Sequence, residues 1–159
     1  MSATALTSEE RASVLSRAPA FALVPPEGRA LLAEMVTVEA VAAGRHLFRA
    51  GDVAGDLFVV AKGRLAVHLA DAAPGDPPLQ ELGPGEVVGE YGLFSGLRRT
   101  ASVVATEDAV LMALDYERFR NLLLEEPTVT LALLEAAVRR LVEIEAGGRA
   151  AKGPTGGVP

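Results

Sequence analysis

Hydrophobic residues are spaced in three different ways along this chain. In the first part, Thr7 and Glu10 have the spacing of a capping box, which predicts a helix over residues 7–16. A second helix is expected after Pro26, where the apolar residues recur at the spacing that places them on one helix face. These residues are Leu31, Leu32, Met35 and Val36. The chain is therefore predicted to begin with helices within residues 7–35.

In the second part, residues 36–114, short apolar runs alternate with Gly, Asp and Pro. Such runs, with turn signals every 8–12 residues, are typical of a β-sandwich or barrel. The expected strands are Val36–Val41, His46–Arg49, Leu57–Ala61, Leu65–Leu69, Leu79–Leu82, Ala101–Ala105 and Val110–Leu114. The segment from Asp71 to Pro78 is rich in Pro, Asp and Gly and is predicted to be an exposed loop.

The third part is helical again. Asp115 is the expected cap of one helix, and a longer helix is expected from Pro127, because proline is tolerated in a first turn. The longer helix carries an apolar stripe of Leu131, Leu134, Val138 and Leu141. We expect this stripe to pack on the protein's own strands, and the alternative is a homodimer seam. These helices cover residues 115–146, and residues 147–159 are predicted to be a flexible tail rich in Gly and Pro.

Composition narrows the function classes. The chain has 159 residues, which fits one domain at residues 1–146, and its net charge of −6 gives no general attraction to nucleic acid. Cysteine is absent, and no apolar run approaches the roughly 18 residues of a membrane span. The N-terminus does not resemble a secretory signal, so a cytoplasmic location is expected. The two histidines and the serines form no recognisable metal or nucleophile pattern, so neither a metal site nor an enzyme is predicted.

The segment GEVVGEYGLFSGLRRTASVVA, residues 85–105, has the residue types of a sugar-phosphate site. A short helix beginning at Tyr91 and a strand beginning near Ala101 would enclose it. Glycines let backbone come close to a ligand, and Arg99 supplies a permanent charge whose fork matches two phosphate oxygens. Glu90 accepts hydrogen bonds only, which suits ribose hydroxyl donors. The residues therefore indicate binding of a sugar phosphate, with no acid–base pair for catalysis.

The same segment resembles the phosphate-binding cassette of the cyclic nucleotide-binding domain. This domain occurs in catabolite-activator-type regulators, cyclic-nucleotide-dependent kinases and nucleotide-gated channels. The resemblance covers roughly residues 7–142, and upstream it includes GRHLFRAGDVAGDLFVVAKGRLAVHL. It implies a mainly β fold with flanking helices: a jelly-roll-type β-roll of about eight strands, with N-terminal helices and two C-terminal helices.

The resemblance also implies roles for single residues, with cAMP or cGMP as the ligand. Arg99 would bind the cyclic phosphate and Glu90 the ribose 2′-hydroxyl. Thr100 would touch the phosphate or the base, although it is equally a plain strand residue, and it favours cGMP only slightly. Arg139 or Arg140 would close over the base as a lid, or else remain a solvated helix charge. Backbone groups around the sugar phosphate would come from Gly89, Gly92, Leu93 and Ala101.

The expected function is a non-enzymatic cyclic nucleotide sensor that signals through its C-terminal helices to an unidentified protein effector. No cofactor is expected, and no direct DNA binding, because only eighteen residues follow Leu141. The alternative is a β-roll interaction module that no longer binds nucleotide.

Overall fold

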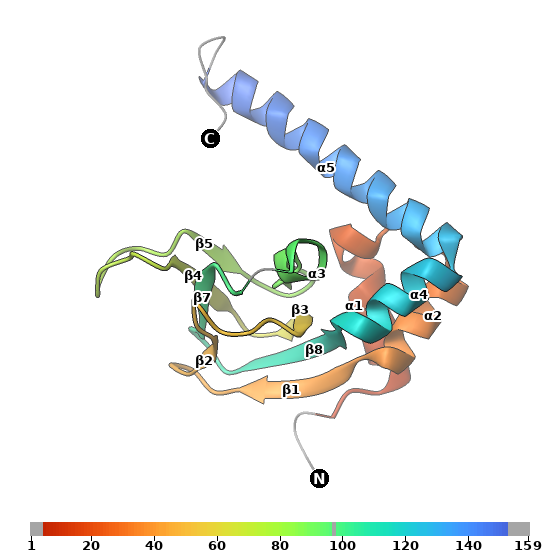
Figure 1. Ribbon diagram of the computed structural model, residues 1–159, viewed down its shortest axis with the longest axis horizontal. Coiled ribbons are helices and arrows are strands. Elements are labelled where there is room, and N and C mark those ends of the chain that lie inside the picture. Colours follow the sequence, from red (N-terminus) through yellow and green to blue (C-terminus); the bar gives the residue numbers. More distant parts are fainter. Residues whose placement is uncertain (1–4, 97, 153–159) are drawn as a thin grey trace.

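The computed structural model describes residues 5–96 and 98–152, and it places a β-roll beside a group of helices (Figure 1). The N-terminal helices are α1 (Ser8–Arg17), η1 (Pro19–Phe21) and α2 (Pro26–Met35). The strands are β1 (Thr37–Val41), β2 (His46–Phe48), β3 (Asp56–Lys62), β4 (Leu65–Leu69), β5 (Gln80–Leu82), β6 (Val87–Val88), β7 (Ala101–Ala105) and β8 (Ala109–Asp115). The remaining helices are α3 (Tyr91–Ser95), α4 (Tyr116–Glu125) and α5 (Pro127–Lys152).

The strands form two four-stranded sheets with antiparallel pairing. Their orders are β1-β8-β3-β6 and β2-β7-β4-β5. The predicted fold class, a mainly β roll with helices at both ends, is confirmed. The strand β6 was not among the expected runs, since two valines are too short a signal to distinguish from a turn.

Strand β3 shows why the roll and the helices form one unit. Successive side chains of a strand point to opposite faces of the sheet. Phe58 and Val60 therefore pack inside the roll, against residues of the second sheet such as Leu65. Leu57 and Val59 point the other way and join the cluster that includes the buried side chains of the helices. Burial on both faces explains why this strand is a continuous apolar run.

Local signals at the helix ends are confirmed. The Thr7 side chain accepts a hydrogen bond from the Glu10 backbone N–H, and the Glu10 carboxylate accepts one from the Thr7 backbone N–H. Asp115 caps α4 by accepting from the Arg118 backbone N–H at 2.9 Å. In α2 the expected apolar face is correct for Leu32 but wrong for Leu31, which is exposed.

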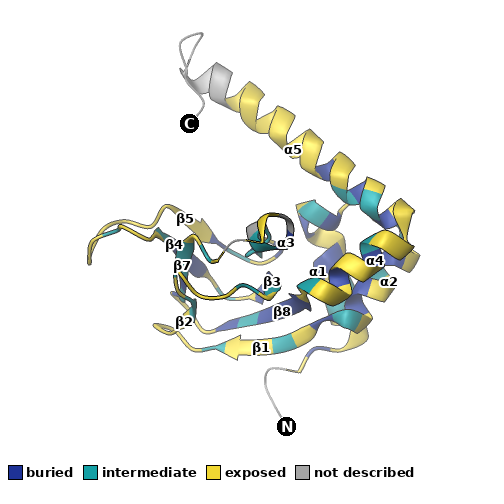
Figure 2. Cartoon of the chain, in the orientation of Figure 1, coloured by how far each residue is buried: buried dark blue, intermediate teal, exposed yellow. Residues whose placement is uncertain are grey.

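Helix α5 differs from expectation in which face it buries. Its stripe of Leu131, Leu134, Val138 and Leu141 is 50–65% exposed, so the prediction that the stripe packs on the strands is wrong. The buried face consists of Val129, Ala132 and Ala136. Small side chains there let the helix approach its neighbours closely, and its main contacts are with η1 and α4. Figure 2 shows that the rest of α5 is largely exposed.

Helix α5 continues to Lys152, past residue 147 where a tail was expected to begin, and residues 153–159 lie outside the described residues.

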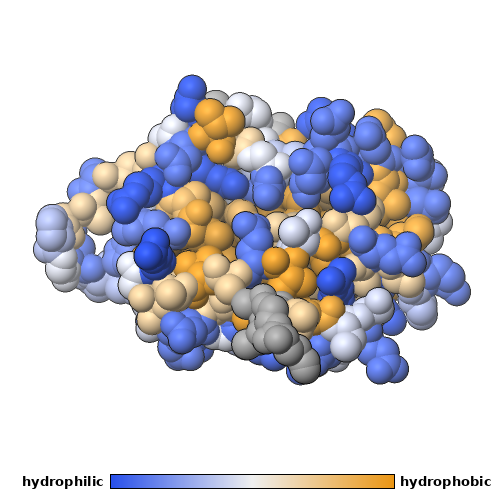
Figure 3. All heavy atoms as spheres, turned by 90° about the horizontal axis from the view of Figure 1, so that it is seen from below, coloured by the Kyte–Doolittle hydropathy of each residue, from blue (hydrophilic) through white to orange (hydrophobic). Residues whose placement is uncertain are grey.

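Seen from below, the molecule has hydrophobic residues near the middle of the face and hydrophilic ones around them (Figure 3). Within the described part of the chain, no helix is long and apolar enough to cross a membrane.

Candidate functional site

The segment between β6 and β7, which we call the cassette (residues 89–100), has the predicted local structure. Gly89 follows β6 with a φ of 88°, a left-handed conformation that glycine adopts without steric cost. The expected short helix is α3, which begins at Tyr91, and the expected strand is β7, which begins at Ala101. The cassette thus contains α3 and connects a strand of one sheet to a strand of the other.

The Arg99 side chain donates three hydrogen bonds. Its Nη2 donates to the Asp56 carbonyl oxygen at 2.8 Å. Its Nη1 donates to the Gly89 carbonyl oxygen at 3.2 Å and to the Tyr116 hydroxyl at 3.1 Å. The guanidinium also lies 4.0 Å from the centre of the Phe48 ring, a distance that allows a cation–π interaction. These contacts hold Arg99 in one position, half-buried in the wall of the roll.

The charge of Arg99 is not matched by a carboxylate. Within the described part of the chain, the guanidinium forms no ion pair, and its partners are neutral oxygens and aromatic rings. Its buried Nε has no hydrogen-bond partner among the described residues. Because a guanidinium has five N–H donors and three are engaged here, Arg99 keeps the capacity to donate to an anion. A half-buried cation without an anionic partner favours an anion-binding site.

The cassette glycines make room for this arrangement. A Cβ atom on Gly89 would come within 2.7 Å of Arg99 Nη1. A Cβ atom on Gly92 would come within 2.7 Å of the Tyr116 hydroxyl and 2.8 Å of the Ala54 Cβ. The sequence predicts that these glycines let a ligand come close to the backbone. The structure shows that they also leave space for the side chains of Arg99 and Tyr116.

A cavity of about 740 Å³ lies against Arg99, and we call it the arginine cavity. Its size is within the range of small-molecule sites. Most residues predicted from the sequence line it: Gly89, Glu90, Gly92, Arg99, Thr100 and Ala101. The rest of its lining includes apolar residues of β4, β5, β6 and β7, together with Phe48, Gln80 and Arg98.

A second cavity, of about 400 Å³, lies on the helix side of the cassette, and we call it the helical cavity. The two predicted residues that do not line the arginine cavity, Leu93 and Arg140, line this one. Glu90 and Val87 line both cavities. The remaining lining is mostly apolar and comes from η1, α4, α5 and β3.

Glu90 is the ionisable group between the two cavities. Burial raises its pKa above the ordinary value, while a hydrogen bond from its own backbone N–H and the charge of Arg140 act in the opposite direction. Its carboxylate faces an environment with few polar partners, so hydroxyl donors from a ligand would replace lost solvation. Asp56 also has a raised pKa, caused by burial and by Asp115 and opposed by Arg99.

Residues 38–126 match the family of the cyclic nucleotide-binding domain, which is more than half of the chain. This chain belongs to that family. Among curated relatives, the cyclic AMP receptor protein of Thermus thermophilus is 35% identical over 102 residues, which are 64% of this chain and 47% of that protein. The cAMP-dependent protein kinase regulatory subunit of Blastocladiella emersonii is 35% identical over 96 residues, 60% of this chain and 24% of that protein. The chain therefore spans less than half of each relative.

Solved structures agree with this family. The N-terminal domain of a transcriptional regulator from Streptomyces coelicolor superposes with a TM-score of 0.70 and 34% sequence identity. The match covers 84% of this chain and 93% of that domain. The likeness therefore extends over the roll and most of the helices, well beyond the cassette.

Sequence reasoning missed Tyr116, Phe48 and Asp56. Tyr116 directly follows the Asp115 cap, so it was predictable as the first helical residue, but its hydroxyl contacts depend on the tertiary fold. Phe48 lies within an expected strand, and nothing in its spacing distinguishes a ring that contacts a guanidinium from an ordinary core residue. Asp56 contributes a backbone oxygen, a role that carries no sequence signal.

Proposed function

We propose that this chain is a non-enzymatic sensor that binds a cyclic nucleotide, cAMP or cGMP, in the arginine cavity. The observation that carries the proposal is Arg99, a half-buried cation with spare donors and no ion pair within the described residues, in the wall of a cavity of about 740 Å³. A cyclic phosphate carries a single negative charge and would therefore supply the anionic partner that Arg99 lacks among the described residues. Arg99 would donate to its oxygens in charge-assisted hydrogen bonds.

The other cavity residues fit the rest of the ligand. Glu90 would accept from the ribose 2′-hydroxyl, which is the free hydroxyl of the sugar because the 3′ and 5′ oxygens are bonded to the cyclic phosphate. Backbone groups of Gly89, Gly92 and Ala101 would surround the sugar phosphate, and Leu93 would support α3 from the helix side. Thr100 is exposed at the cavity, where its hydroxyl is available to the phosphate or the base.

The proposed response to binding is a movement of α4 and α5. Arg140 lines the helical cavity beside Glu90, so the lid role proposed for it requires α5 to shift toward the arginine cavity. Helix α5 is suited to such a shift because its buried side chains, Val129, Ala132 and Ala136, are small, while its apolar stripe is exposed. Pairing of that stripe with a second copy, or with a protein effector, stays a prediction.

Calorimetric titration with cAMP and cGMP tests the proposal. Arg99→Ala should weaken binding by about 10- to 100-fold, because a hydrogen bond to a charged group contributes about 1.5–3 kcal/mol and each 1.4 kcal/mol is tenfold. The matched control is Arg45→Ala, which removes the same charge from an exposed residue that lines neither cavity. Its effect should stay within about threefold.

Two results would contradict the proposal. Equal affinities of the wild type and Arg99→Ala would remove the phosphate role of Arg99. No binding of either nucleotide, together with no thermal stabilisation at millimolar concentration, would favour a β-roll interaction module instead. A ligand at 100 times its dissociation constant should add about 2.7 kcal/mol to the stability of the folded state.

A further inference from the structure

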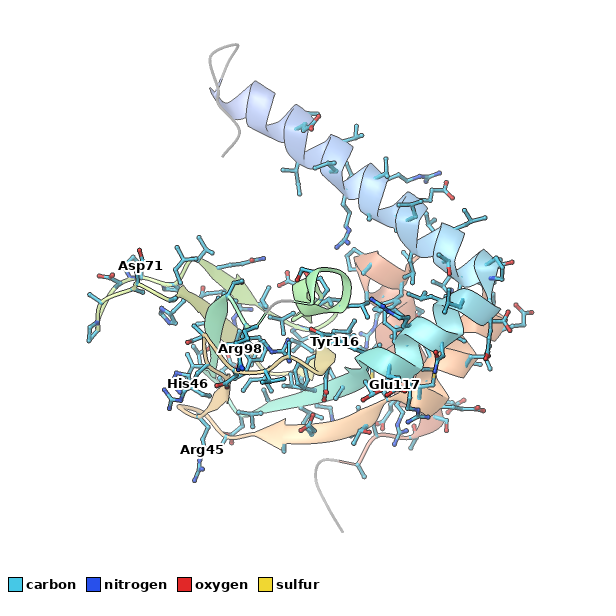
Figure 4. All side chains as sticks on the ribbon, viewed as in Figure 1. Arg45, His46, Asp71, Arg98, Tyr116 and Glu117 are labelled. Carbon is cyan, nitrogen blue, oxygen red and sulfur yellow. The ribbon has the colours of Figure 1, made fainter. Side chains whose placement is uncertain are left out.

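Tyr116 lies outside the arginine cavity, yet it contacts both ends of the cassette. It is the first residue of α4 and lies below α3, as Figure 4 shows. Its hydroxyl donates to the Gly89 carbonyl oxygen and accepts from Arg99 Nη1 at 3.1 Å. Its backbone N–H donates to the Gly55 carbonyl oxygen at 2.8 Å. The residue is thus bonded at both its backbone and its hydroxyl.

The Tyr116 hydroxyl differs in kind from the other oxygens that accept hydrogen bonds from Arg99. The other two oxygens that accept from the guanidinium, at Gly89 and Asp56, belong to the backbone. Within the described residues, Tyr116 supplies the one side-chain oxygen that accepts from Arg99. Burial raises the pKa of Tyr116, although Arg99 opposes this, so the hydroxyl keeps its proton near neutral pH and can donate to Gly89.

The absence of a side chain at Gly92 leaves the space that this hydroxyl occupies. A Cβ atom on Gly92 would approach the Tyr116 hydroxyl to 2.7 Å and its Cε2 to 3.0 Å. Alanine or any larger residue would therefore displace the ring. A second bond joins the same helix to the cassette, because Arg120 Nη2 donates to the Leu93 carbonyl oxygen at 2.9 Å. The start of α4 is thus attached to residues that flank α3, through Tyr116, and to α3 itself, through Arg120.

We infer that Tyr116 is a positioning residue that holds Arg99 toward the phosphate subsite and so ties the start of α4 to the occupancy of the cavity. The inference rests on the proposed function. When the remaining donors of Arg99 bind a phosphate, any movement of the guanidinium would reach the Tyr116 hydroxyl through their shared hydrogen bond, at the first residue of α4. Tyr116 does not line the arginine cavity, so we expect it to act on the ligand through Arg99.

A double-mutant cycle tests this role. Tyr116→Phe removes the hydroxyl and keeps the ring, and it should weaken cyclic nucleotide binding by about three- to tenfold, the equivalent of one hydrogen bond. In an Arg99→Ala background the same change should alter affinity by less than about twofold, because Tyr116 acts through Arg99. Arg99→Met, which keeps a stem against Phe48, replaces Arg99→Ala if that variant does not fold.

The control is Thr106→Val, which removes a hydroxyl that donates to the Arg64 carbonyl oxygen at 3.3 Å, lines neither cavity and leaves the contacts of Arg99 intact. It should leave the affinity within about twofold. The same cycle, measured on the free energy of unfolding without nucleotide, should show a nonadditive term between Tyr116 and Arg99.

The outcomes separate the two proposals. Binding by the wild type with equal losses from Tyr116→Phe in both backgrounds would overturn the positioning role and leave the proposed function standing. No binding by the wild type would overturn the proposed function. In that case additive unfolding energies would also overturn the link between Tyr116 and Arg99.

Discussion

The two cavities on either side of Glu90 are lined by different kinds of groups. The arginine cavity is walled by strands and by the cassette, and its cation is fixed by backbone oxygens at 2.8 and 3.2 Å. The helical cavity is walled by apolar side chains of helices, and one of them, α5, is attached through small residues such as Ala132 and Ala136. Under the proposed function, recognition and response would occupy these two adjoining spaces, with Glu90 and Val87 common to both.

The largest effect on stability should come from adding a side chain to the closely packed cassette. In Gly92→Ala the new methyl group would meet the Tyr116 hydroxyl at 2.7 Å and the Ala54 Cβ at 2.8 Å. Overpacking of this kind costs about 1–3 kcal/mol, measurable by denaturant unfolding. Gly55→Ala is the matched control, because its Cβ would meet nothing within 4 Å and its φ is not positive, so stability should change by less than about 0.5 kcal/mol. Equal costs at both glycines would contradict the close packing described for the cassette.

Glu90→Gln should have a smaller effect, of opposite sign on binding and on stability. A neutral amide oxygen would bind the ribose less strongly by about 1 kcal/mol, which is about fivefold in affinity. In the unliganded protein, burial raises the pKa of Glu90, so its contribution to stability is present below the unfolded pKa and is lost as the pH rises through the higher folded pKa. Glutamine does not ionise.

The Glu90→Gln variant should therefore unfold at a higher temperature than the wild type at pH 7. This advantage should disappear in acid, below the pKa of an unfolded glutamate. Thermal unfolding between pH 3.5 and 7 checks this, with Glu86→Gln as the control, since Glu86 is exposed and its carboxylate accepts from the Gly83 backbone N–H at 3.2 Å. A constant difference across the pH range would contradict the burial argument.

Local patterns predicted most of the fold and most of the arginine cavity. The capping box at Thr7, the cap at Asp115 and the strand at Ala101–Ala105 depend on neighbours in sequence, and each is confirmed. Six of the predicted binding residues line one cavity because the cassette is a continuous segment. Distances within such a segment are limited by the chain itself, so spacing alone conveys much of the geometry.

Features that depend on contacts between distant segments could not be predicted. The Tyr116 hydroxyl reaches a cassette that is 27 residues away in sequence. The apolar stripe of α5 satisfies the helical period, but period does not reveal whether a surface is available to cover it. Alanines at positions 132 and 136, which look neutral in a sequence, form the buried face instead, because η1 approaches the helix there.

The smallest expected effect concerns the helical cavity. If nucleotide binding moves α5, amide exchange in residues 127–142 should change by about threefold or more at saturating ligand, which corresponds to roughly 0.7 kcal/mol. Global stabilisation by the ligand slows all the most protected amides alike, so the change in α5 is read relative to β8, whose residues Leu111 and Met112 are fully buried. Helix α1 is the control for the helices, because it is capped at its own N-terminus and lines neither cavity. A uniform change across α1, β8 and α5 would mean that the helical cavity does not respond to the ligand, and the output of the sensor would have to be sought on the roll itself.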